Sequence, residues 1–266
     1  MKKGLIGISI LLLLLFGTLL LGELPFSICL SLFAILSLRE LLNIRGKDKH
    51  IPTEIELLAY MIVIFFAMNN YDSSIDYYLL DYRLLAALIL FDFTPLVIIN
   101  DKRKYNVIDA LYLIGSTLFI GVTFNLIAQF RNYNVDYVVY IMLIAFITDL
   151  FGLITGKYIG QHKLITSISP KKTVEGALGG LFMGTFIPTL YYMSTIPCKI
   201  PIFGVVFITM LLSMIGQIGD LVFSFIKREF GKKDFSNIVA GNGGILDVFD
   251  SIIFVTLGFL LFLAVL

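Results

Sequence analysis

The chain has 266 residues, of which 58% are hydrophobic and 15% charged, a composition that excludes an ordinary water-soluble globular protein. Its 20 Lys and Arg residues against 19 Asp and Glu give a net charge of +1, so no global excess of positive charge is available for nucleic acid, and we expect no such partner. With two histidines and two cysteines, there is no basis for a His-rich metal site or a disulfide framework.

Nine apolar segments each approach the length of about 20 residues that a membrane-spanning helix needs. They cover residues 4–22, 25–43, 55–69, 79–99, 106–128, 137–158, 174–194, 201–223 and 246–266. The third segment is short and only residues 22–25 separate the first two, so eight or ten spans are alternatives. The first segment follows two lysines and could be a secretory signal, but no A-x-A-like site follows it, and we interpret it as a retained anchor.

Positive charge is distributed unequally between the loops that join these segments. Short cytoplasmic loops collect Lys and Arg, and a cytoplasmic N-terminus puts nearly all of them on that side, except Arg83, Arg131 and Lys199. The sequence therefore predicts an all-α polytopic integral membrane protein with about nine transmembrane helices and a cytoplasmic N-terminus. Because no Pro/Ser-rich linker interrupts it, we expect one membrane domain over 1–266, with little motif content in 1–130 and the catalytic helices and loops in 137–266.

Carboxylates inside apolar segments need an explanation, since one at the bilayer centre costs roughly 2.5–3.5 kcal/mol. With the predicted orientation, five of them lie in the cytoplasmic half of their segments: Asp149, Glu175, Asp220, Asp247 and Asp250. Asp92 and Asp109 are further candidates, but no pattern surrounds them. The five patterned acids are therefore the first candidates for a functional site.

The eighth segment and its extension place a carboxylate and two cations on one helix face. Residues at i, i+4, i+7 and i+8 share that face, and here they are Asp220, Ser224, Lys227 and Arg228. Asp247 and Asp250 share a side of the next helix, just after a turn with glycines at 241, 243 and 244. Such a turn admits phosphate or metal closely. The alternative is an ordinary positive-inside cluster whose acids form salt bridges.

The loop between the sixth and seventh segments brings lysines and hydroxyls to a helix N-terminus. Its candidates for binding an anion are Lys163, Ser169, Lys171, Lys172 and Thr173. Thr173 is predicted to be the N-cap, and the free N–H groups of the first helical turn, with the lysines, would favour an anion. Taken alone, the segment is better explained as an ordinary turn and topology signal.

Glycines repeat every four residues along the sixth segment, at 152, 156 and 160, and along the seventh, at 176, 180 and 184. Small-residue faces let helix backbones approach closely. We expect these two helices to pack tightly, with packing against each other as one option, and to fix Asp149, which lies on the face of Gly152.

These residues resemble the phosphatidate cytidylyltransferase (CDP-diacylglycerol synthase) family. Residues 224–250 are similar to its C-terminal signature, S-x-x-K-R-x4-K-D followed by H-G-G-x-x-D-R-x-D, and residues 149–180 look like its central motif. Outside these regions only Arg39-Glu40 is similar beyond hydropathy. The chain departs from the signature at two positions, with Asn242 in place of the His and Val248 in place of the Arg.

The resemblance implies that CTP and phosphatidic acid give CDP-diacylglycerol and pyrophosphate. This reaction of phospholipid biosynthesis would be an Mg²⁺-assisted nucleotidyl transfer, with a second cation left open, at the cytoplasmic face of a bacterial inner membrane. The implied metal ligands are Asp220, Asp247 and Asp250. The implied catalytic residues are Lys171, Lys172, Lys227, Arg228 and Asp149. The implied binding residues are Ser169, Thr173, Ser224, Lys163, Lys233, Gly243 and Gly244. Membrane lipid is the surrounding partner, and a homodimer is an option.

Two other interpretations stay open. A non-catalytic or altered-substrate relative is suggested by Asn242 and Val248, because Asn does not titrate near neutrality and Val does not hydrogen-bond through its side chain. An ion-coupled membrane transporter would also carry intramembrane acids, but it predicts acids near the midplane and an inverted repeat. The patterned acids here lie to one side and late in the chain.

Overall fold

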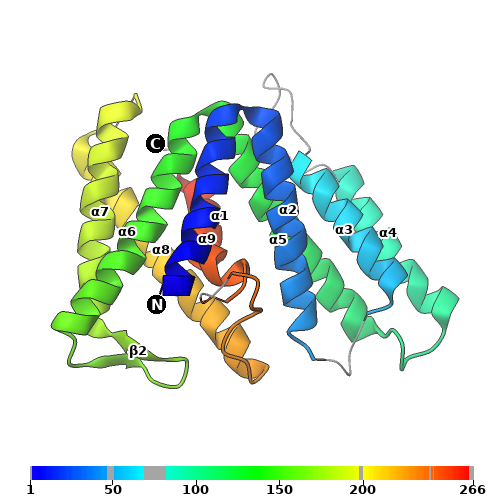
Figure 1. The fold of residues 1–266 in the computed structure, drawn as a ribbon. Coiled ribbons are helices and arrows are strands. Elements are labelled where there is room, and N and C mark those ends of the chain that lie inside the picture. Colours follow the sequence, from blue (N-terminus) through cyan, green and yellow to red (C-terminus); the bar gives the residue numbers. More distant parts are fainter. Residues whose placement is uncertain are drawn as a thin grey trace. The chain divides into compact units, whose positions relative to one another are not determined.

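The computed structural model describes residues 2–46, 51–68, 82–197, 200–239, 241 and 243–263. Within these residues the chain forms nine helices and one short hairpin (Figure 1). In chain order the elements are α1 (Lys2–Leu21), α2 (Glu23–Asn43), α3 (Thr53–Met68), α4 (Tyr82–Ile99), α5 (Val107–Tyr133), α6 (Val135–Tyr158), β1 (Lys163–Ile165), β2 (Ser169–Thr173), α7 (Val174–Thr195), α8 (Ile202–Glu229) and α9 (Leu246–Phe262).

Each predicted apolar segment coincides with one of these helices, and the all-α class is confirmed apart from the hairpin. Helix α8 continues past its apolar segment to Glu229, so the predicted helical extension that carries Lys227 and Arg228 is confirmed. Four of the described helices, α2, α5, α6 and α8, are long and apolar enough to cross a membrane by length and composition. The count of nine spans and the orientation stay predictions. Residues 69, 79–81 and 264–266 of the predicted segments lie outside the described residues.

The chain divides into two compact units. The first contains Met1–Tyr133 and Asp234–Leu246, and the second contains Asn134–Lys233 and Asp247–Leu266. The main division is close to the predicted boundary between the N-terminal and catalytic helices. That the chain forms a single membrane domain stays a prediction.

In the first unit, α2 and α3 both pack against α5, and α4 packs against α3 and α5. The ring of Phe66 is buried on α3 and lies against Gly121 of α5, where a side chain would meet it at 2.9 Å. At the other end, Arg45 pairs with Asp109, and the Tyr112 hydroxyl donates to the Leu41 carbonyl at 2.6 Å. Polar contacts therefore join the C-terminal end of α2 to the start of α5.

In the second unit, the glycine faces of α6 and α7 meet as predicted. A Cβ on Gly176 would lie 2.7 Å from the Gly152 carbonyl oxygen, and one on Gly180 would lie 2.5 Å from the Thr148 carbonyl oxygen. The predicted tight packing of these helices is confirmed, because only glycine leaves room for the opposing backbone. Figure 1 shows the two helices side by side, with the hairpin connecting one end of the pair.

Helices α8 and α9 of the second unit also approach closely. Gly219 of α8 lies against Phe254 of α9, where an added Cβ would meet the ring at 2.6 Å. The rings of Phe223 and Phe254 pack edge to face, with centroids 6.1 Å apart. This contact carries α8 alongside α9 and sets the distance between the polar residues at their ends.

Candidate active site

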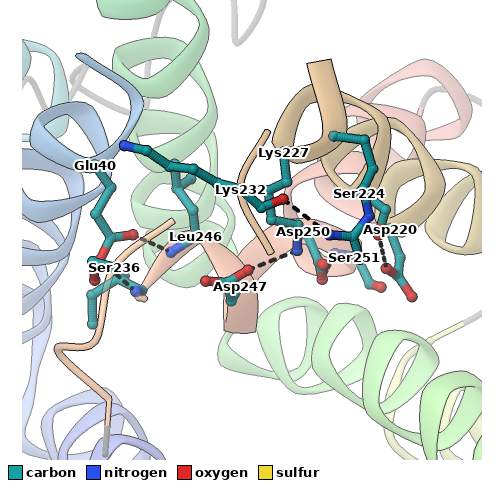
Figure 2. A network of polar contacts seen from close by, with 12 residues as sticks. Glu40, Asp220, Ser224, Lys227, Lys232, Ser236, Leu246, Asp247, Asp250 and Ser251 are labelled. Carbon is teal, nitrogen blue, oxygen red and sulfur yellow. Dashed lines mark hydrogen bonds and ion pairs between the residues drawn. The ribbon is translucent and has the colours of Figure 1, made fainter. Parts of the chain in front are cut away.

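Lys227 and Asp247 form a buried ion pair between the end of α8 and the start of α9. The Lys227 Nζ donates to the Asp247 Oδ1 at 2.7 Å, and the two side chains are only 10% and 6% exposed (Figure 2). A charged pair buried to this degree is costly to form and more costly to break from one side. Both residues were predicted site residues, and the structure brings them together.

The positively charged partner of Asp220 is a lysine of the hairpin. Lys172 of β2 forms an ion pair with Asp220 of α8, and the Ser224 hydroxyl donates to the Asp220 Oδ1 at 3.3 Å. The predicted face carrying Asp220 and Ser224 is therefore confirmed (Figure 2). The hairpin and α8 had been predicted as separate groups of site residues, and this ion pair joins them.

Asp149 and Asp250 complete a group of carboxylates around Asp220. The charge of Asp220 repels those of Asp149 and Asp250, and the latter two repel each other. Asp250 is buried, accepts a hydrogen bond at 2.7 Å from the Ser251 N–H, and is attracted by Lys227. We call Asp149, Asp220, Asp247, Asp250, Lys172 and Lys227 the acid–lysine cluster.

The acid–lysine cluster suits a hard divalent cation by its chemistry. Mg²⁺ prefers carboxylate oxygens, and the cluster brings four carboxyl groups beside two lysine ammonium groups. As they stand, no three His, Cys, Asp or Glu side chains in the described part of the chain are grouped closely enough to hold a metal ion. The lysines at present take up carboxylate oxygens that such an ion would need.

The remaining predicted residues of the hairpin surround this cluster more loosely. Thr173 is the N-cap of α7, with extended backbone angles and its hydroxyl accepting from the Gly176 N–H at 3.1 Å, so the predicted cap is confirmed. Ser169 is half-buried, whereas Lys163 and Lys171 are exposed. The two lysines therefore present their charges at the surface of the hairpin.

Two cations lie at the end of α8. Arg228 is exposed, and its Nε donates to the Ile168 carbonyl at 3.3 Å while Nη1 donates to the Lys232 carbonyl at 3.0 Å. Lys233 is exposed as well. Arg228 thus fastens the tip of the hairpin to the end of α8, a structural contact that also keeps a guanidinium beside the loop.

The predicted glycine turn belongs to the first unit. Gly241 and Gly243 have φ of +82° and +93°, which L side chains rarely adopt, so glycine is needed at both. Gly244 lies directly against the carboxyl group of Glu40, a contact treated below. Asn242 lies outside the described residues.

Comparison with known sequences gives evidence on the family of this chain that is independent of the geometry. The sequence model of the cytidylyltransferase family matches residues 2–266. The chain belongs to this family.

Several curated members of the cytidylyltransferase family are similar along most of their length. The phosphatidate cytidylyltransferase of Staphylococcus saprophyticus is 36% identical over 225 residues, or 84% of each chain. Those of Staphylococcus epidermidis and Staphylococcus haemolyticus are 34% and 33% identical, each over 96% of both chains. The match therefore includes the N-terminal helices, where the sequence alone showed similarity only in hydropathy apart from Arg39-Glu40.

Two polar contacts of this cytidylyltransferase-family chain were not predicted, although Glu175 was among the candidate acids: the structure pairs it with His162 and does not place it in the acid–lysine cluster. His162 and Glu175 meet at 2.6 Å between Nδ1 and Oε1, and Glu175 also accepts from the Gln161 and His162 N–H groups. This contact closes the base of the hairpin. Glu40 was noted only for its place beside Arg39, because no sequence period connects it with residues about 200 positions later.

Proposed function

We propose that the chain is a phosphatidate cytidylyltransferase, which makes CDP-diacylglycerol and pyrophosphate from CTP and phosphatidic acid. Its family and the names of its relatives support this reaction. Within the structure, the supporting observation is the acid–lysine cluster, in which Lys172 and Lys227 each reach a carboxylate from a different element.

The reaction needs no nucleophile from the protein. A phosphate oxygen of phosphatidic acid attacks the α-phosphorus of CTP, the bond to the bridging α–β oxygen breaks, and pyrophosphate leaves with the electron pair. Both substrates are polyanions, so the protein must hold them in line and offset their repulsion. Lysines and carboxylate-bound cations suit this task better than a catalytic triad.

Each group of the cluster then has a role. Lys172 and Lys227 would exchange their carboxylate partners for phosphate oxygens, since both ammonium groups already bind an anionic oxygen and charge-assisted bonds to phosphate are of the same kind. Asp220, Asp247 and Asp250 would hold Mg²⁺, which when bound neutralises phosphate charge and polarises phosphate oxygens. Asp149, which lies close enough to Asp220 for the two carboxyl groups to interact, would be a further oxygen donor beside the cation.

An outer ring of positive charge would attract the triphosphate and the lipid phosphate. Its members would be Lys171, Arg228, Lys163 and Lys233, with the hydroxyls of Ser169, Thr173 and Ser224 nearby. Long-range attraction of this kind raises the rate at which anionic substrates arrive and weakens with salt. The glycine turn at 243 and 244 would act through its backbone, which phosphate can approach closely where there is no side chain.

A membrane setting explains how both substrates reach one place. We propose nine spanning helices with the N-terminus in the cytoplasm of a bacterium and the acid–lysine cluster at the cytoplasmic edge of the bilayer. The positive-inside distribution of Lys and Arg supports this orientation. CTP then arrives from water while the acyl chains of phosphatidic acid stay in the leaflet.

Purified protein in mixed micelles of detergent and phosphatidic acid, given CTP and Mg²⁺, tests the proposal. We expect equal amounts of CDP-diacylglycerol and pyrophosphate, and loss of at least about tenfold in kcat/KM for Lys172→Met, which removes one charge-assisted contact. Lys102→Met, an exposed lysine of the first unit, is the matched control and should retain full activity.

The same assay distinguishes an enzyme from a relative that binds the substrates without turnover. A non-catalytic relative, suggested by Asn242 and Val248, would bind CTP without releasing pyrophosphate. Binding without turnover in the presence of Mg²⁺ and phosphatidic acid would overturn the enzyme proposal.

A further inference from the structure

Glu40 is a buried carboxylate that accepts hydrogen bonds from a segment about 200 residues later in the chain. It is 2% exposed and lies near the C-terminal end of α2. Its Oε1 accepts from the Ser236 hydroxyl at 2.6 Å and from the Ile245 N–H at 2.9 Å, and its Oε2 accepts from the Leu246 N–H at 2.9 Å. Figure 2 shows the carboxylate between Ser236 and Leu246, within the first unit.

These hydrogen bonds account for a carboxylate in a buried position. An ionised carboxyl group is costly to bury unless donors satisfy its oxygens, and bonds from N–H groups to a charged acceptor are about twice as strong as neutral ones. Leu246 is the first residue of α9. A negative charge is favoured at such a helix N-terminus, where the N–H groups have no partner within the helix.

The glycine turn is shaped to this carboxylate. Any Cβ at Gly244 would overlap both oxygens of Glu40, so the position admits no side chain while Glu40 is in place. Gly243 has a φ of +93°, and its carbonyl accepts from the Val239 N–H at 2.8 Å, which closes the loop. Glycine is therefore needed at the two positions for different reasons. At Gly243 the backbone angle requires it, and at Gly244 the carboxylate leaves no room for a side chain.

We propose that Glu40 is a positioning residue for the cytidylyltransferase reaction. It fixes the segment from Ser236 to Leu246, and Asp247 follows Leu246 directly in the chain. The carboxylate of the N-terminal half thereby sets where the helix bearing Asp247 and Asp250 begins. This inference rests on the proposed function, and it gives Glu40 a role that the sequence did not reveal.

The test compares Glu40→Gln with Glu54→Gln, an exposed glutamate on α3 of the same unit. Gln keeps one acceptor oxygen but turns a donor toward one of the N–H groups. Removing an outer-shell partner of a metal site costs about 10–100-fold, so we expect kcat/KM of Glu40→Gln to fall in that range with a raised Mg²⁺ midpoint. Glu54→Gln should match the wild type in both.

Hydrogen exchange without Mg²⁺ or substrate supplies a readout separate from activity. In Glu40→Gln, peptides covering 236–246 should exchange faster, while peptides from α6 and α7 should not change. Faster exchange together with reduced turnover supports positioning. Faster exchange with wild-type kcat/KM and Mg²⁺ midpoint would overturn it, because the loop would then be held without consequence for the site. Unchanged exchange would overturn it as well.

A double-mutant cycle tests the contact itself and allows for poor folding of single variants. Gly244→Ala clashes with the carboxylate in the wild type, whereas Glu40→Ala opens the space that the new methyl group needs. We expect the fall in kcat/KM from Gly244→Ala to be much smaller in the Glu40→Ala background, as for residues in direct contact. Independent effects would refute the proposal. An inactive wild-type protein would instead refute the proposed function itself.

Discussion

The ion pair between Lys227 and Asp247 allows a prediction in which stability and activity separate. Both side chains are at least nine-tenths buried, with 2.7 Å between Nζ and Oδ1. Lys227→Met leaves the Asp247 carboxylate without its cation in a buried place. Loss of one partner of a buried pair costs about 3–5 kcal/mol, which lowers Tm by roughly 6–20 °C for a protein of this size.

Replacing both members should recover most of that loss. In Lys227→Met combined with Asp247→Asn, neither member of the pair leaves the other as an unpaired buried charge, and only the attraction of Lys227 for Asp250 is still lost. Substitution of a whole buried pair is often close to neutral. Activity should not recover, because both the ammonium donor and the proposed metal ligand are absent. Stability is restored in the double variant while turnover is lost in all three.

The assay is thermal unfolding of the purified protein in detergent, read beside CDP-diacylglycerol formation. Lys102→Met, at an exposed lysine, should shift stability by no more than about 0.5 kcal/mol. If the double variant is destabilised by the sum of its single changes, the two groups do not interact as the structure has them. If it regains turnover, neither belongs to the chemistry.

Three further predictions follow from the second unit. Gly180→Ala places a methyl group 2.5 Å from the Thr148 carbonyl oxygen and should lower the free energy of unfolding by about 1–3 kcal/mol through overpacking. The control Gly115→Ala has open space around it and should not destabilise the protein. Equal Tm values for the two variants would contradict this packing. Thr173→Ala should lose about 1 kcal/mol with the N-cap, and Thr173→Ser should keep it, as unfolding measurements can check. Asp149→Asn keeps the size of the side chain and removes a carboxyl group beside Asp220, so Tm should not fall although CDP-diacylglycerol formation does; a lower Tm with full turnover would be the opposite result.

Local features of the sequence were enough to predict the helices. Apolar runs of about 20 residues have few alternatives to a helix in lipid, because every backbone N–H and C=O must be satisfied internally. The four-residue glycine repeats likewise specify one face of a helix, and the faces of α6 and α7 meet as expected. The N-cap at Thr173 follows from neighbouring residues alone.

Pairings between distant elements could not be predicted in this way. Helical spacing places Asp220 and Lys227 on one face, but tertiary packing decides that Asp220 takes Lys172 and that Lys227 takes Asp247. The contact between Glu40 and Leu246 joins positions whose separation carries no periodic signal. The family signature indicated which acids to consider, while the structure shows that Asp220 meets Lys172 and Asp247 meets Lys227.

The hairpin was a further omission, with a physical reason. Its strands are three and five residues long and carry Pro170 and two adjacent lysines, so they lack the alternation of apolar and polar residues that indicates a strand. Contacts at its ends hold it, through Glu175 at the base and Arg228 at the tip. The effect is to hold Lys172 against Asp220.

Tracing the phosphorus of CTP tests the central claim most directly. Purified protein is given phosphatidic acid, Mg²⁺ and CTP labelled at either the α- or the γ-phosphate. We expect α-label to enter the lipid as CDP-diacylglycerol, γ-label to leave in pyrophosphate, and Asp247→Asn to abolish both. Label from the γ-position in the lipid, or release of γ-phosphate alone, would contradict nucleotidyl transfer at the acid–lysine cluster.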